Sequence, residues 1–299
     1  MTMKKQAAVM GAFVADALSL GVHWVYNTAV IDKKFGQIKK FYDPLTSYHK
    51  GKRAGDFTHY GDQTLVLLEA IGGGSGFDID RFALAWRDFF TDYTGYFDQA
   101  TKATLENMAR GDNLTQCAST SDDLAGASRM APLVSLYAGD RDGLVQSARA
   151  QTAVTHNDQR VIEAAGFFAR TVFVVLDGQK PGEAIEAALE AGFADSVIAP
   201  LIQMGLESRG RDTRETIAEF GQMCSVEAGL PGAVHLIARH GNDFETAMVE
   251  NVMAGGDSSA RGMLAGMVLG AAHGMAAIPD EWISGLNAGD RIEKLLKMA

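Results

Sequence analysis

The stretch Arg261-Gly262-Met263-Leu264-Ala265-Gly266-Met267-Val268-Leu269-Gly270-Ala271-Ala272-His273-Gly274 decides the fold. Its glycines recur every four residues, so on an α-helix they form one continuous stripe. Glycine inside a helix costs about 1 kcal/mol relative to alanine. A stripe of four glycines therefore predicts that a second backbone approaches this helix very closely.

A matching stripe of small residues lies on the first helix of the chain, at Ala8, Gly11, Ala15 and Ser19. We expect the two stripes to face each other in the core. This packing would bring Asp16 and His23 close to the loop at Asp257.

The remaining sequence is helical in pattern almost throughout. Apolar residues recur at three-to-four spacing in residues 160–176, 183–189 and 222–239. Five aspartates follow or form turn signals and are expected to cap helix N-termini: Asp78, Asp140, Asp212, Asp243 and Asp280. With no convincing strand, residues 1–299 are predicted to form a single all-α domain.

The composition of the 299 residues limits the class of protein. Hydrophobic residues make up 47% and charged residues 21%, as in a soluble globular protein. A net charge of −10 argues against general affinity for nucleic acid or anionic lipid. The apolar run from Gly262 to Ile278 is interrupted by His273 and is short for a membrane span. With no signal-peptide cleavage site, the expected compartment is the cytoplasm.

Two short segments offer oxygen ligands for a cation. Tyr60-Gly61-Asp62-Gln63-Thr64 and Gly255-Gly256-Asp257-Ser258-Ser259-Ala260 each contain one carboxylate followed by neutral oxygen donors. Mg²⁺ prefers carboxylate oxygens and water. One ion could be held by Asp62 and Asp257 with Thr64 and Ser258, whereas two ions would need more carboxylates. Alternatively, Asp257 and the serines cap a helix.

Three further residues are candidates for substrate binding. Arg261 lies four residues after Asp257, a spacing that favours an ion pair, but its guanidinium would also match a phosphate group. His23 is a satisfied core residue, a general acid–base or a neutral metal ligand. Gln63 supplies a neutral amide beside Asp62.

Several motifs of this chain resemble, in order, those of the ADP-ribosylglycohydrolase family, which includes the dinitrogenase-reductase-activating glycohydrolase. They are Ala15-Asp16-Ala17-Leu18, Asp62-Gln63-Thr64, Ala127-Ser128-Arg129-Met130-Ala131-Pro132-Leu133, Thr155-His156-Asn157-Asp158 and Gly255-Gly256-Asp257. The resemblance implies an orthogonal multi-helix bundle with a two-Mg²⁺ centre that hydrolyses glycosidic bonds to ADP-ribose.

The chain also departs from the family's pattern. The family motif Thr-Asp-Asp-Thr is replaced by Gly61-Asp62-Gln63-Thr64, and Gly-Gly-Asp-Thr-Asp-Thr is replaced by residues 255–260, so each motif loses one carboxylate. His23 stands where many members place a glutamate. The segments around His23 and Tyr60 are similar to those of the branch that contains J-type lens crystallins and selenoprotein J.

The resemblance thus implies a hydrolase acting on ADP-ribose or a related nucleotide sugar, with Asp62 and Asp257 as catalytic residues. Its substrate would be small-molecule or protein-linked ADP-ribose, bound by Arg261, His23 and Gln63. The degenerate metal centre would hold one Mg²⁺ ion or none. Two alternatives remain open: an inactive nucleotide binder and a crystallin-like structural protein. Convergence of the candidate residues on one polar cleft would favour the first two functions.

Overall fold

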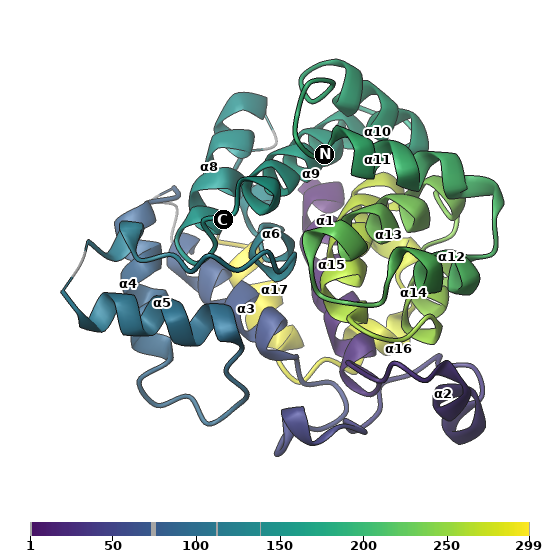
Figure 1. Ribbon diagram of the computed structural model, residues 1–299, viewed down its shortest axis with the longest axis horizontal. Helices are drawn as coiled ribbons and strands as arrows, with labels where there is room; N and C mark the ends of the chain where they lie inside the picture. Colours follow the sequence, from purple (N-terminus) through teal and green to yellow (C-terminus); the bar gives the residue numbers. More distant parts are fainter. Residues whose placement is uncertain (1, 73–75, 112, 138, 299) are drawn as a thin grey trace.

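The computed structural model describes residues 2–72, 76–111, 113–137 and 139–298. Within these residues the chain forms α-helices and short 3-10 turns but no sheet (Figure 1), which confirms the all-α prediction. The α-helices are α1 Thr2–Leu20, α2 Thr28–Phe35, α3 His59–Ile71, α4 Ile79–Phe89, α5 Gln99–Ala109, α6 Ala125–Ser128, α7 Leu133–Tyr137, α8 Arg141–Ala153, α9 Gln159–Leu176, α10 Pro181–Glu190, α11 Ala199–Glu207, α12 Thr213–Phe220, α13 Val226–Arg239, α14 Phe244–Met253, α15 Ser258–His273, α16 Asp280–Ser284 and α17 Gly289–Leu296.

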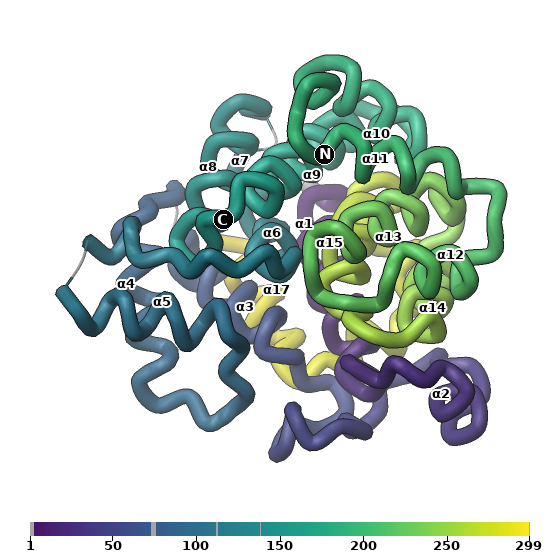
Figure 2. The backbone as a smooth tube through the Cα atoms, viewed as in Figure 1, coloured from purple at the N-terminus to yellow at the C-terminus, as the bar shows by residue number. Residues whose placement is uncertain are grey.

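The predicted pairing of the first and late helices is the centre of the fold. Figure 2 shows the purple α1 running beside the yellow-green helices of the last third of the chain. A Cβ added at Gly266 would overlap the carbonyl oxygen of Gly11, and one added at Gly270 would overlap that of Ala7. The glycine stripe therefore exists because the two backbones touch.

One glycine of the predicted stripe, Gly274, lies outside the helix. Gly274 does not belong to α15 but ends it, with a φ of 76° and no atom near its missing side chain. The left-handed conformation that terminates the helix favours glycine. The close approach of the two backbones thus uses Gly266 and Gly270, whereas a Cβ at Gly262 would meet the Asn251 side chain.

Most of the predicted helix starts are confirmed. Asp78, Asp140, Asp212 and Asp243 each accept a backbone N–H from the first turn of a helix. The prediction for Asp280 is wrong, because this residue is the first of α16 and no side chain caps that helix. The helix expected from residue 222 begins only at Val226, since residues 222–225 pair with neighbouring loops instead.

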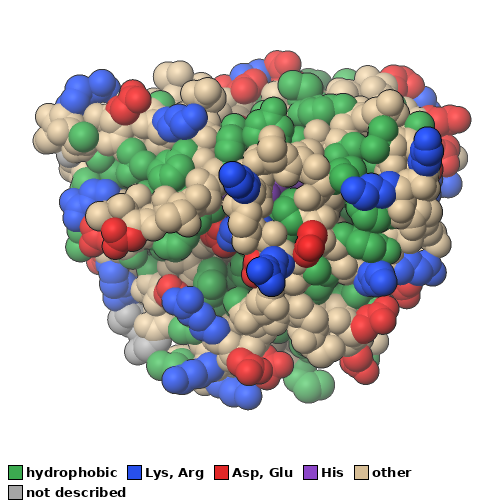
Figure 3. All heavy atoms as spheres, turned by 90° about the horizontal axis from the view of Figure 1, so that it is seen from below, with side chains coloured by type: hydrophobic (Ala, Val, Ile, Leu, Met, Phe, Trp, Pro, Cys, Tyr) green, Lys and Arg blue, Asp and Glu red, His purple; other side chains and the backbone are tan. Residues whose placement is uncertain are grey.

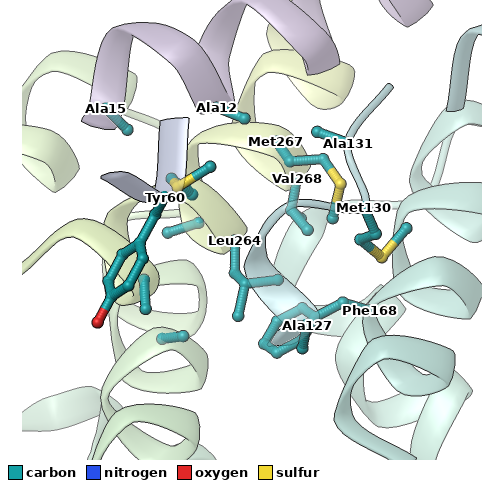
Figure 4. Packing of buried hydrophobic residues seen from close by; sticks show 14 of the residues in the cluster. Ala12, Ala15, Tyr60, Ala127, Met130, Ala131, Phe168, Leu264, Met267 and Val268 are labelled. Carbon is teal, nitrogen blue, oxygen red and sulfur yellow. The ribbon is translucent and has the colours of Figure 1, made fainter. Parts of the chain in front are cut away.

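The core joins distant parts of the chain around α15. Figure 4 shows Ala12 and Ala15 of α1 beside Leu264, Met267 and Val268 of α15. Tyr60 lies at the edge of this cluster, with its hydroxyl directed away from the apolar side chains. Among the described helices, none is long and apolar enough to cross a membrane.

Candidate functional site

The turn before α15 is tied to two other loops by backbone hydrogen bonds. Gly256 exchanges hydrogen bonds with the turn after α1: its N–H donates to the Val25 carbonyl and its carbonyl accepts from Trp24, both at 2.9 Å. The Asp257 N–H donates to the carbonyl of Gln222 at 2.8 Å. Trp24 has a φ of 62°, rare for a non-glycine residue and common at functional sites. The predicted proximity of the first helix to Asp257 is therefore present.

Asp257 lies at the closed end of the site and is only 1% exposed. Its Oδ1 accepts the Ala260 N–H at 3.1 Å, so it caps α15 as the sequence suggested. Its Oδ2 accepts from the Tyr60 hydroxyl at 2.9 Å and from Trp24 Nε1 at 3.3 Å. Burial raises the pKa of the Asp257 carboxyl, while these donors and Arg261 oppose that shift. Three donors aimed at one carboxyl favour its ionised form.

A second buried carboxyl, Asp123, meets the same tyrosine. Its Oδ2 lies 3.3 Å from the Tyr60 hydroxyl, and its Oδ1 accepts the Ala125 N–H at 2.9 Å. Burial and the nearby Asp257 raise the pKa of Asp123 well above its ordinary value. Burial and both carboxylates also raise the pKa of Tyr60, so the hydroxyl keeps its proton.

One hydroxyl proton cannot serve both carboxylates, and this limits the proton arrangement. The Tyr60 hydroxyl lies within donor distance of both, 2.9 Å from Asp257 Oδ2 and 3.3 Å from Asp123 Oδ2, so it donates more strongly to Asp257. Because burial raises the pKa of Asp123 well above its ordinary value and Tyr60 lies closer to Asp257, Asp123 holds a proton more readily than Asp257 does. We call Asp123, Tyr60 and Asp257 the carboxyl relay.

Sequence reasoning missed Asp123 and its neighbour Cys224. Asp123 precedes α6 in a polar loop, and nothing in its local pattern distinguishes it from the adjacent Asp122. The thiol of Cys224 hydrogen-bonds to Asp123, and burial together with the two carboxyls raises the pKa of that thiol. Only the pairing of residues 122–125 with 224–226 brings these groups together.

Three buried histidines lie beside the relay. The His23 Nδ1 is 4.0 Å from Asp257 Oδ1, and neither of its ring nitrogens has a hydrogen-bond partner among the described residues. The rings of His49 and His59 lie 5.2 and 6.3 Å from that of His23. Burial, with the other two histidines and Arg261, lowers the pKa of His23 well below its ordinary value. His23 is therefore a neutral member of the site.

Aromatic rings form the outer edge of the site. Trp24, Tyr48 and Tyr96 meet nearly edge-on, with centroids 5.0, 5.1 and 5.4 Å apart, and we call these three residues the aromatic rim. Tyr48 is 49% exposed. Figure 3, viewed from below Figure 1, shows a hollow near the centre of that face with a histidine visible at its floor.

Asp62 lies outside the relay, in the first turn of α3. Both its oxygens contact Lys52 Nζ, at 2.8 and 2.6 Å, and Oδ2 also accepts the Tyr93 hydroxyl at 2.6 Å. Burial raises the pKa of Asp62, and the ion pair with Lys52 opposes that shift.

Gln63 and Thr64 are engaged in the interior of the helix bundle. The Gln63 Oε1 accepts from Trp86 Nε1 at 2.7 Å and from Arg129 Nη1 at 3.0 Å. The Thr64 hydroxyl donates to the Tyr60 carbonyl at 2.9 Å. Arg129 also donates through Nε to Gln151 Oε1 at 2.7 Å, so amide oxygens surround its guanidinium.

The serines after Asp257 differ in their contacts. The Ser259 hydroxyl donates to Asp16, which also accepts the N–H and hydroxyl of Thr58 at 2.8 and 2.6 Å. Burial raises the pKa of Asp16 to about 6. The Ser258 hydroxyl is buried and has no partner among the described residues.

Arg261 is fully buried and supports the loop before α15. Its Nη2 donates to the Gly255 carbonyl at 2.7 Å, while Nε and Nη1 have no partner among the described residues. The ion pair with Asp257 suggested by their spacing is not formed within 4.0 Å. Burial lowers the pKa of Arg261 to about 10, and Asp257 opposes that shift.

The residues present do not fit the two-Mg²⁺ centre that the family resemblance implies. Asp62 is held by Lys52, and the side-chain oxygens of Gln63 and Thr64 are used elsewhere. The ligand atoms of Asp123, Cys224 and Asp257 lie within 4.8 Å of one another. A thiol, however, suits a softer ion than Mg²⁺. The single ion predicted on Asp62 and Asp257 with Thr64 and Ser258 stays a prediction.

Comparison with known proteins identifies the family of this chain. A family model described as ADP-ribosylglycohydrolase matches residues 3–299. The chain belongs to the ADP-ribosylglycohydrolase family. A solved structure titled ADP-ribosylglycohydrolase-related protein complex has the same fold, with a TM-score of 0.72 at 23% identity over 99% of this chain and 96% of that chain.

Proteins similar to this chain include two crystallins. Crystallin J1A of Tripedalia cystophora is 27% identical, over 99% of this chain and 97% of its own length. Crystallin J1B of the same organism is 25% identical, over 94% and 91% respectively. An uncharacterized protein of Archaeoglobus fulgidus is 28% identical, over 99% and 95%. The resemblance to the crystallin branch is thereby confirmed.

Proposed function

We propose that this chain hydrolyses a glycosidic bond of ADP-ribose or a related nucleotide sugar, using the carboxyl relay. The observation that supports this most strongly is the pair of buried carboxyls joined by the Tyr60 hydroxyl, of which Asp123 has its pKa raised well above the ordinary value. Glycoside hydrolysis uses two carboxyl groups, one that donates a proton and one that accepts a proton. Family membership supports the same class of reaction.

Each group of the relay then has one step. Asp123 gives its proton to the leaving atom as the glycosidic bond breaks. Asp257 takes a proton from the water that adds to the sugar carbon. The Tyr60 hydroxyl passes this proton from Asp257 back to Asp123, which restores the starting state. The Ala260 N–H and Trp24 Nε1 keep Asp257 oriented throughout.

The aromatic rim is the proposed substrate entrance. Trp24 belongs to the aromatic rim and also donates to Asp257. A planar base or sugar face packed on the rim would therefore lie within reach of the relay. Small-molecule or protein-linked ADP-ribose is the proposed ligand, and the cytoplasm is the proposed compartment. Arg261 supports the Gly255 loop, and its role in substrate binding stays a prediction.

A pair of neighbouring aspartates tests this proposal. Asp257→Asn keeps an oxygen to cap α15 but removes the base, so release of ADP-ribose from a panel of N- and O-linked conjugates should fall by about 10²–10⁴-fold. The control is Asp122→Asn, whose 46% exposed side chain lies outside the relay. It should match the wild type. Equal activity of Asp257→Asn and wild type would refute the proposal.

The crystallin relatives favour a second candidate, a structural protein that keeps the fold without turnover. That function predicts no release of ADP-ribose from any conjugate and no binding of ADP-ribose by titration calorimetry. Binding without turnover would indicate an inactive nucleotide binder instead.

A further inference from the structure

Lys52 lies against Asp62 with the geometry of a bound cation. Its Nζ reaches both carboxylate oxygens, at 2.8 and 2.6 Å, and stands 6.0 Å from the centre of the Tyr93 ring. Tyr93 completes the set by donating its hydroxyl to Asp62 at 2.6 Å. The side chains of Lys52 and Asp62 are 20% and 13% exposed, so solvent screens this pair less than a surface ion pair.

The loop that carries Lys52 is fixed in place. The Lys52 N–H donates to the His49 carbonyl at 3.1 Å, and Asn287 holds the carbonyl of Gly55 with its backbone N–H at 3.0 Å. Gly55 has a φ of 87°, and a side chain there would overlap the carbonyl oxygen of Gly285. Lys52 is therefore held at Asp62 before any ligand arrives.

The charges at this corner balance without a metal ion. In a motif with two carboxylates and one bound divalent cation, the net charge is zero. Here one carboxylate is replaced by the Gln63 amide, which faces Trp86 and Arg129 instead. The remaining carboxylate, Asp62, and the Lys52 ammonium also sum to zero.

We propose that the Lys52 ammonium stands in the place of a divalent cation on Asp62, so that this corner of the site takes no metal ion. Its third N–H, beyond the two directed at Asp62, is left for an oxygen atom of a ligand, such as a sugar hydroxyl. The proposal concerns metal binding and stands apart from the proposed hydrolysis, since its test requires no turnover.

Titration with Mn²⁺, followed by electron paramagnetic resonance of the free ion, tests the proposal in four proteins. Lys52→Ala should bind one more Mn²⁺ ion per chain than the wild type, because Asp62 then lacks its cation. Adding Asp62→Asn to Lys52→Ala should remove that extra ion. Asp62→Asn alone should bind as many Mn²⁺ ions as the wild type, which separates this corner from any ion on Asp257.

Two results would overturn the proposal. One is a wild-type Mn²⁺ site that Asp62→Asn abolishes, since a metal would then occupy the corner despite Lys52. The other is a folded Lys52 variant that binds no more Mn²⁺ than the wild type. Lys52→Met, which keeps the aliphatic stem, replaces Lys52→Ala if the latter fails to fold by circular dichroism.

Discussion

The substitution Tyr60→Phe removes one oxygen atom. It breaks the hydrogen-bonded link between Asp123 and Asp257 and leaves the packing of the ring intact. The ring is buried against His23 and His59 with centroids 5.5 and 4.1 Å away, and phenylalanine keeps these contacts. Only the hydroxyl, 2.9 Å from Asp257 and 3.3 Å from Asp123, is lost. Any change in turnover therefore reports on the relay rather than on the fold.

The size of the effect follows from the contacts of Asp257. A hydrogen bond to a charged group contributes about 1.5–3 kcal/mol. Because Asp257 keeps the Ala260 N–H and Trp24 Nε1, the loss in folding free energy should lie near 2 kcal/mol. Proton transfer in the transition state is worth about 10²–10⁴ in rate. The variant should therefore stay folded at 25 °C but lose at least about 100-fold in kcat.

The assay compares Tyr60→Phe with Tyr137→Phe and the wild type. Tyr137 ends α7, away from the relay, and serves as the matched control. Release of ADP-ribose from the conjugate that the wild type cleaves fastest gives kcat, and urea denaturation gives stability. A kcat of Tyr60→Phe within threefold of the wild type would show that the hydroxyl transfers no proton between the two carboxyls. The proposed relay would then be wrong.

Two further predictions concern stability. In urea titrations, Gly266→Ala should destabilise the protein by about 1–3 kcal/mol, because its new methyl group meets the backbone of α1. The control Gly182→Ala, whose methyl group would have no atom closer than 3.9 Å, should be neutral or stabilising. Burial lowers the pKa of His49 and of His156 to about 3, so their neutral forms stabilise the fold above pH 6.5 and this contribution is lost as the pH falls. At pH 5 the loss is about 2 kcal/mol per histidine, while the raised pKa values of Asp16, about 6, and of Asp123 act in the opposite direction. In urea titrations at pH 7 and pH 5, His49→Gln should therefore lose less stability on acidification than the wild type, and an equal loss would contradict this prediction.

The central helix pair could be predicted from sequence because its cause is local and periodic. Glycine every four residues has few explanations other than a close backbone, and Gly266 against Gly11 is that contact. The end of α15 was harder to predict. Gly274 continues the four-residue spacing but adopts a left-handed conformation. Spacing alone cannot distinguish a glycine inside the helix from a glycine that ends it.

The candidate site was only partly predictable. Asp257 and His23 lie together as the helix pairing required. Asp123 and Lys52 come from loops whose positions depend on distant contacts, such as Leu124 with Cys224. Gln63 neighbours Asp62 in sequence yet lies on a different side of α3, because successive residues on a helix point about 100° apart.

The most direct test of the account is the rate of ADP-ribose release at neutral pH in excess EDTA, for the wild type beside Asp123→Asn. The relay predicts that the wild type cleaves a conjugate equally fast with and without EDTA, and that Asp123→Asn is at least about 100-fold slower because it lacks the acid. Loss of wild-type activity in EDTA would assign the chemistry to a metal ion. An Asp123→Asn rate equal to that of the wild type would remove Asp123 from the mechanism.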